Sequence, residues 1–167
     1  MRLFIAVGLS DEMKRSLKRA QRELYARGMR GNFTPEENLH LTRACIGEYP
    51  DSEPVMDALS TISFEPFELA LDGMGCFGEL IWAGVADSAA LEAVARRVRR
   101  ALAEGEVPVD KMRFSPHITL LRKASRKLPG VELAPASMLV GAISLLRSER
   151  GKNGMIYTEL GVLEAQR

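Results

Sequence analysis

The order of predicted elements constrains the fold of this chain more than any other feature of its sequence: strand, helix and second strand follow one another, and the same order recurs. The apolar run Leu3–Leu9 predicts the first strand. Apolar residues at helical spacing then predict a helix between Ser10, which can cap it, and Gly28, which can end it. After a turn-rich segment, Leu39–Ile46 predicts the next strand, which contains the first histidine.

The second half repeats this order with additional strands. A short helix introduced by Asp51 precedes it, and a longer helix with one apolar stripe begins after Ser88, a capping residue. Strands are predicted at Phe67–Leu71, Leu80–Ala86, Pro116–Leu121, Met138–Leu146 and Met155–Leu163, with a turn at Gly73–Gly78 and a link between the last two strands near Gly151.

This order of elements favours an α+β fold, in which helices cover the outer faces of antiparallel sheets and a cleft separates two lobes. The chain has 167 residues, 46% of them hydrophobic, and no Pro- or Ser-rich linker divides it. We therefore expect residues 1–167 to form one domain of two pseudo-symmetric lobes.

Both histidines of the chain occur in the same setting, His40-Leu41-Thr42 and His117-Ile118-Thr119. The chain has only five threonines, so a chance match at both histidines has a probability of about one in a thousand. Residues two apart on a strand point to one face, so each motif presents an imidazole and a hydroxyl to a common cleft.

Two facing imidazoles can perform both proton transfers of a displacement at phosphorus. Imidazole has a pKa of about 6.5, so near neutral pH one ring can accept a proton while the other donates one. The hydroxyls of Thr42 and Thr119 can stabilise charge on the phosphoryl oxygens. Because the sequence has no carboxylate cluster for magnesium and no phosphate-binding glycine loop, we expect no metal and no cofactor.

Charge and composition limit the remaining function classes. With 23 basic and 22 acidic residues, the chain has no bulk attraction for nucleic acid or an anionic membrane. We interpret the basic run Arg96, Arg97, Arg99 and Arg100 as a solvated helix face. Cys45 and Cys76 are interpreted as small core residues, and no secretory or membrane-spanning segment is found, so we expect a cytoplasmic monomer.

The residues around both motifs resemble the 2H phosphoesterase superfamily, which is named for paired H-x-[ST] motifs, and within it the RNA 2′,3′-cyclic phosphodiesterases of bacteria and archaea. The resemblance covers nearly the whole chain. It is carried by Arg2-Leu3-Phe4-Ile5-Ala6-Val7, Pro35-Glu36-Glu37-Asn38-Leu39-His40-Leu41-Thr42, Leu80-Ile81-Trp82-Ala83-Gly84-Val85 and Phe114-Ser115-Pro116-His117-Ile118-Thr119-Leu120-Leu121-Arg122.

The resemblance implies a bilobal fold with both histidine strands lining the cleft, and hydrolysis of 2′,3′-cyclic phosphates on RNA ends or nucleotides to 2′-phosphates. His40 would donate a proton to the leaving 3′ oxygen and His117 would activate water, although the symmetry of the site allows the reverse. Thr42, Thr119 and Arg122 would bind the phosphate. Strict alternation from His117 places Arg122 on the opposite face, unless the strand ends or bulges first.

Arg43 departs from the family, whose members commonly carry an apolar residue at this position, and we expect its side chain to run along a covering helix away from the cleft. Phe33, Phe77 and Phe114 can be base-stacking residues, although the core is the preferred interpretation for each. Two alternative functions stay open: 2′-5′ joining of RNA ends, and binding of a nucleotide or RNA end without catalysis.

Overall fold

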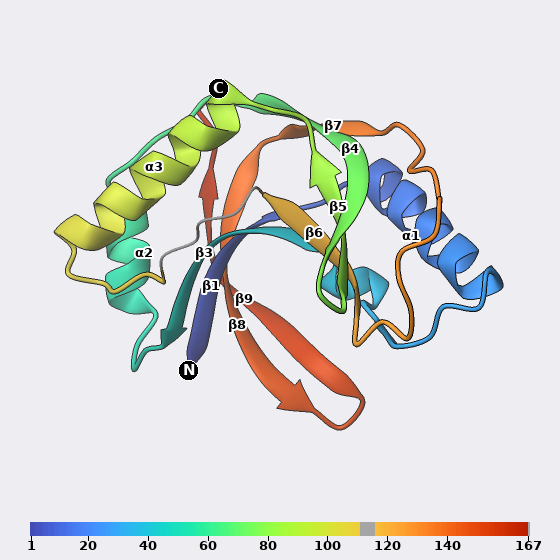
Figure 1. Cartoon of the computed structure of the whole chain (residues 1–167). Coiled ribbons are helices and arrows are strands. Elements are labelled where there is room, and N and C mark those ends of the chain that lie inside the picture. Colours follow the sequence, from blue (N-terminus) through green and yellow to red (C-terminus); the bar gives the residue numbers. More distant parts are fainter. Residues whose placement is uncertain (111–115, 167) are drawn as a thin grey trace.

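A computed structural model describes residues 1–110 and 116–166, which form two antiparallel sheets and three α-helices (Figure 1). The predicted α+β fold class is confirmed. The first sheet has the order β3 (His40–Glu48), β1 (Arg2–Gly8), β8 (Ala142–Gly151) and β9 (Gly154–Glu164). The second has the order β2 (Asn32–Phe33), β6 (His117–Arg122), β5 (Leu80–Val85), β4 (Phe67–Phe77) and β7 (Ser137–Val140).

The two longer helices begin at the serines that the sequence predicts as caps. The hydroxyls of Ser10 and Ser88 accept hydrogen bonds from backbone N–H groups and cap α1 (Asp11–Ala26) and α3 (Ala89–Glu104). Gly28 follows α1 with a φ of 89°, a conformation that glycine adopts without strain. The third α-helix is α2 (Glu53–Leu59), and a short 3-10 turn, η1 (Glu36–Asn38), precedes β3.

Each sheet is covered by helices on one side. Figure 1 shows α1 beside the second sheet, and α2 with α3 beside the first. Accordingly, α1 contacts β6 and β7, whereas α3 contacts α2 and β3 and also reaches β4. The buried side chains of both sheets and all three helices form one hydrophobic cluster, which includes Ile5, Leu17, Leu69, Leu102 and Leu145.

Three sequence-based predictions about turns, strands and cysteines are wrong. The turn between β4 and β5 consists of Gly78 and Glu79 and does not span Gly73–Gly78, because β4 continues to Phe77 and Gly73 lies at a register irregularity with a φ of 72°. Met138–Leu146 is not one strand: the chain passes from β7 of the second sheet to β8 of the first at Gly141. Cys76 is exposed and Cys45 is only half-buried, so neither belongs to the buried core.

The described residues contain no helix that is both long and apolar enough to cross a membrane.

Candidate active site

The ring of His40 is held in one orientation by the residues that lead into β3. Asn38 is buried, and its side-chain amide donates to the carbonyl of Met155 in β9 at 2.9 Å. The backbone carbonyl of Asn38 lies 2.7 Å from Nδ1 of His40. A carbonyl can only accept, so Nδ1 carries the hydrogen and Nε2 is the nitrogen left for proton transfer.

Nε2 of His40 lies 2.8 Å from the hydroxyl of Thr42, on the same face of β3. When the ring is neutral, Nδ1 holds its only proton, so the Thr42 hydroxyl donates to Nε2. When the ring is protonated, Nε2 donates to the Thr42 oxygen instead. The predicted pairing of imidazole and hydroxyl is therefore present in the first motif.

The two histidines have matching aromatic surroundings, one pair of rings from each sheet. His40 lies beside Phe4 of β1 and Tyr157 of β9, with ring centroids 5.0 and 5.2 Å away. His117 lies beside Phe77 of β4 and Trp82 of β5, at 5.3 and 6.2 Å. Phe77 is 43% exposed, so its preferred interpretation as a core residue is wrong.

Burial lowers the pKa of His40 below its ordinary value, and the positive charges of Arg122 and Lys14 act in the same direction. The hydrogen bond to the Asn38 carbonyl opposes this shift. Arg122 also acts on the phenol of Tyr157, although burial is the larger influence there and raises the Tyr157 pKa. Arg122 of the second sheet is thus electrostatically coupled to two side chains of the first.

A β-bulge explains why the side chain of Arg122 lies on the same face of β6 as Thr119. Ile81 pairs with Leu121 but Trp82 pairs with Thr119, so β6 has one extra residue between its partners. As a result Leu120 and Leu121 are both buried, and Arg122 returns to the face of Thr119. Strict alternation from His117 therefore does not hold, because the strand bulges before Arg122.

A second bulge follows the first motif and changes the position of Arg43. Ile5 pairs with Ala44 and Ala6 with Thr42, which leaves Arg43 as the extra residue of β3. Arg43 lies near Glu92 and Arg99 of α3, as expected for a side chain that follows a helix. It also lines a pocket on the α3 side together with Trp82 and Gly84.

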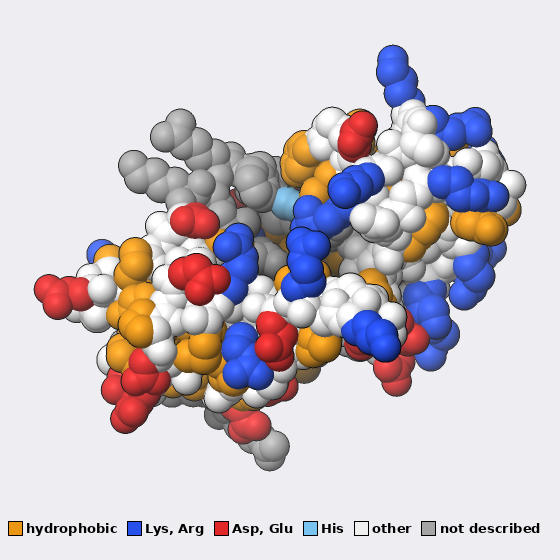
Figure 2. Space-filling view, turned by 90° about the horizontal axis from the view of Figure 1, so that it is seen from below, with side chains coloured by type: hydrophobic (Ala, Val, Ile, Leu, Met, Phe, Trp, Pro, Cys, Tyr) orange, Lys and Arg blue, Asp and Glu red, His pale blue; other side chains and the backbone are white. Residues whose placement is uncertain are grey.

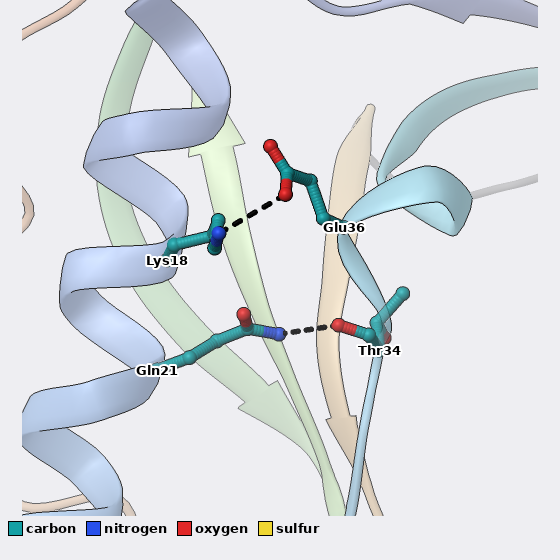
Figure 3. A network of polar contacts seen from close by, with 4 residues as sticks. All are labelled: Lys18, Gln21, Thr34 and Glu36. Carbon is teal, nitrogen blue, oxygen red and sulfur yellow. Dashed lines mark hydrogen bonds and ion pairs between the residues drawn. The ribbon is translucent and has the colours of Figure 1, made fainter. Parts of the chain in front are cut away.

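A network of polar contacts ties the lead-in segment of the first motif to the strand of the second (Figure 3). Nε2 of Gln21 in α1 donates to the carbonyl of Thr34 and to that of Leu120 in β6, both at 2.9 Å. One turn earlier, Lys18 forms an exposed ion pair with Glu36 at 3.0 Å. Gln21 thus links both histidine motifs to one helix.

Several residues of the site were not predicted from the sequence. The sequence indicated Trp82 only as part of the family's middle strand. Gly84 pairs with His117, and Trp82, two residues earlier, lies on the same face of β5 as Gly84. Tyr157, Lys14 and Gln21 carry no local signal, because only the tertiary structure brings them to the site. Phe33 is half-buried, and Phe114 lies outside the described residues.

The surface around the site is basic. Figure 2 shows a histidine side chain at the floor of a hollow, with lysine and arginine side chains on the surface beside it. This local charge contrasts with the net charge of +1 of the whole chain. Within the described residues, no group of three or more His, Cys, Asp or Glu side chains is arranged to hold a metal ion.

Comparison with known proteins identifies several relatives. The chain is 31% identical to an RNA 2′,3′-cyclic phosphodiesterase of Archaeoglobus fulgidus, over 98% of this chain and 100% of the relative. It is 34% identical to a protein of the same name from Thermus thermophilus, over 96% and 88%. A third protein of this name, from Geobacillus stearothermophilus, is 33% identical over 75% of this chain. The match spans only 43% of the length of that relative.

Solved structures share the fold over the whole chain. LigT of E. coli, in complex with 3′-AMP, matches with a TM-score of 0.83 at 26% identity and covers 99% of this chain and 98% of its own. A Thermus thermophilus protein matches with a TM-score of 0.78 at 31% identity, over 98% and 97%. A sequence model of the 2′-5′ RNA ligase superfamily matches residues 9–152. The chain therefore belongs to the 2′-5′ RNA ligase superfamily.

Proposed function

We propose that this protein hydrolyses 2′,3′-cyclic phosphates, on RNA ends or on nucleotides, to 2′-phosphates by metal-independent acid–base catalysis. The observation that carries the proposal is the orientation of His40: its Nδ1 is occupied by the Asn38 carbonyl, and its Nε2 lies beside the hydroxyl of Thr42. The names of the relatives, RNA 2′,3′-cyclic phosphodiesterase, support the substrate class.

In the proposed reaction His117 accepts a proton from water while the water oxygen forms a bond to phosphorus. The bond between phosphorus and the 3′ oxygen breaks, and protonated His40 gives its Nε2 proton to that oxygen. The product carries a 2′-phosphate and a free 3′-hydroxyl. His117 then releases its proton to solvent and His40 takes one up, which restores the starting state.

Thr42, Thr119 and Arg122 are proposed to bind the non-bridging oxygens, on which negative charge accumulates. Thr42 can turn its hydroxyl from His40 to the phosphate, which frees Nε2 for proton transfer. Arg122 brings a fixed positive charge to the same region, since its charge acts on both His40 and Tyr157.

The lowered pKa of His40 fits this assignment once substrate is considered. In the free protein, burial and the charges of Arg122 and Lys14 favour the neutral ring. An anionic phosphate beside these two cations offsets their effect and raises the pKa of His40. Binding of the substrate thus prepares His40 to act as the acid.

The test is hydrolysis of an RNA that ends in a 2′,3′-cyclic phosphate, in the presence of EDTA, by the native chain and by His40→Ala and His117→Ala. We expect a 2′-phosphate product from the native chain and loss of turnover in both variants. Lys18→Met, which removes only an exposed ion pair, is the control and should retain full activity. Turnover that survives in either histidine variant, or that requires a metal, would contradict the proposal.

A second candidate function, 2′-5′ joining of RNA ends, is favoured by the description of the superfamily. It uses the same groups, with the 5′-hydroxyl of another RNA in place of water. The oxygen of that hydroxyl bonds to phosphorus, the bond to the 3′ oxygen breaks, and a 2′,5′-phosphodiester forms. Adding a 5′-hydroxyl RNA to the assay distinguishes a joined product from a hydrolysed one.

If the native chain binds the cyclic phosphate tightly but gives neither product, the function is binding without catalysis.

A further inference from the structure

A pocket adjoins both histidine motifs on the side of α3. Its volume is about 460 Å³, within the range of about 300–1,000 Å³ that is usual for small-molecule sites. Arg43, the residue after Thr42, and Pro116, the residue before His117, both line it. Trp82 and Gly84, the strand partners of Thr119 and His117, form another part of its wall.

Arg43 brings a positive charge into this pocket, and this charge is not neutralised by an ion pair with any described residue. Among the described residues, no acceptor bonds its buried Nε, and no carboxylate forms an ion pair with it. Burial lowers the pKa of Arg43 and the nearby charge of Arg99 lowers it further, while the charge of Glu92 opposes the shift; the guanidinium stays protonated. The charge is therefore held at a free-energy cost that a bound anion would offset.

The rest of the lining indicates what kind of anion fits. Arg96 and Arg99 lie on the α3 side of the pocket, and three carboxylates, those of Asp72, Asp87 and Glu92, also line it. A simple anion would gain from the arginines and be repelled by the carboxylates. A nucleotide has a phosphate for the arginines and also hydroxyl and amino donors for carboxylates, so it matches a lining of both signs.

Trp82 adds a ring on which a base can stack. The indole lines the pocket and contacts His117, and its buried Nε1 has no acceptor among the described residues. Stacking on aromatic rings and contact of arginine with phosphate are the two usual means by which proteins bind single-stranded RNA.

We propose that this pocket binds the nucleotide that precedes the terminal cyclic phosphate in an RNA strand. Arg43 and Arg99 hold the phosphodiester that links the two nucleotides, and Trp82 offers a stacking surface. The inference rests on the proposed function, and it assigns the substrate as an RNA end rather than a free cyclic nucleotide.

The test compares kcat/KM for two substrates with EDTA present: adenosine 2′,3′-cyclic phosphate, and a trinucleotide that ends in the same group. We expect the native chain to prefer the trinucleotide. Arg43→Leu should reduce the ratio of the two values about tenfold or more, since it removes a charge-assisted contact to phosphate. Arg99→Leu, at an exposed helix position, should reduce the ratio in the same direction without risk to the fold.

Arg100→Leu is the matched control, because Arg100 is exposed on the same helix and does not line the pocket. The trinucleotide reaction should also depend less steeply on salt in Arg43→Leu than in the native chain. An unchanged ratio in Arg43→Leu and Arg99→Leu, or an equal fall in Arg100→Leu, overturns the inference.

If the proposed function is wrong, the native chain cleaves neither substrate, which differs from every result above. In that case the pocket is tested by the fluorescence anisotropy of a 5′-labelled trinucleotide. Weaker binding to Arg43→Leu than to the native chain and Arg100→Leu supports the pocket, and equal binding to all three excludes it.

Discussion

Gln21 should contribute more to stability than its position on the surface of α1 suggests. Replacement by Met keeps the length of the side chain and removes two hydrogen bonds of 2.9 Å, to the carbonyls of Thr34 and Leu120. The Leu120 carbonyl keeps a bond from the Thr34 N–H at 3.0 Å, so only the Thr34 carbonyl loses its partner. At about 0.5–1.5 kcal/mol for each bond, the free energy of unfolding should fall by about 2 kcal/mol.

For a chain of this length, such a loss lowers Tm by about 4–8 °C. The assay is urea unfolding followed by circular dichroism, with the midpoint and the slope compared between variants. Lys18→Met is the matched control one turn away, and removal of its exposed ion pair should cost less than about 1 kcal/mol. Equal midpoints for the two variants would refute the argument that Gln21 joins the two motifs.

Two further predictions concern the site itself. In an NMR titration of the two histidines, assigned with His117→Gln, His40 should titrate below its ordinary pKa, with Nδ1 carrying the proton of the neutral ring. The unfolded chain then binds this proton at a higher pH than the folded chain, so stability should fall as the pH drops below about 6.5. A His40 pKa at or above 6.5, or a His40→Asn variant with the same pH dependence of stability, would contradict this. Gly75→Ala should displace Trp82, because its Cβ would overlap the indole atoms Cζ2 and Cη2, and the emission of the only tryptophan should shift. Gly130→Ala, where an added Cβ meets nothing within 4 Å, should leave the emission unchanged, and the same spectrum in both variants would exclude the close approach.

The sequence predicted those elements whose signals are local. The capping serines Ser10 and Ser88, the apolar stripes of α1 and α3 and the period-two strands all depend on residues a few positions apart. The paired motifs could also be read directly, since each places a histidine and a threonine on one face of a strand.

The remaining errors arise where pairing with another strand overrides a local signal. Gly73 and Gly75 suggest a turn, but β4 stays paired with β5, and Gly75 gives the space that Trp82 occupies. Gly141 gives no sign that the chain changes sheets there. The bulges at Arg43 and before Arg122 could not be predicted from local sequence, because they depend on how β3 pairs with β1 and how β6 pairs with β5.

The halves of the sequence do not coincide with the halves of the structure. β1 pairs with β8, which joins Arg2 to Ser148, and α1, which follows β1, packs on the other sheet. The first sheet is thus assembled from both ends of the chain, and the second is covered by a helix from the beginning of the chain. The many contacts between distant residues predict slow, cooperative folding. We expect that a fragment with only one histidine strand does not fold by itself. The relative placement of His40 and His117 would then be acquired late, when the first and last strands of the chain meet.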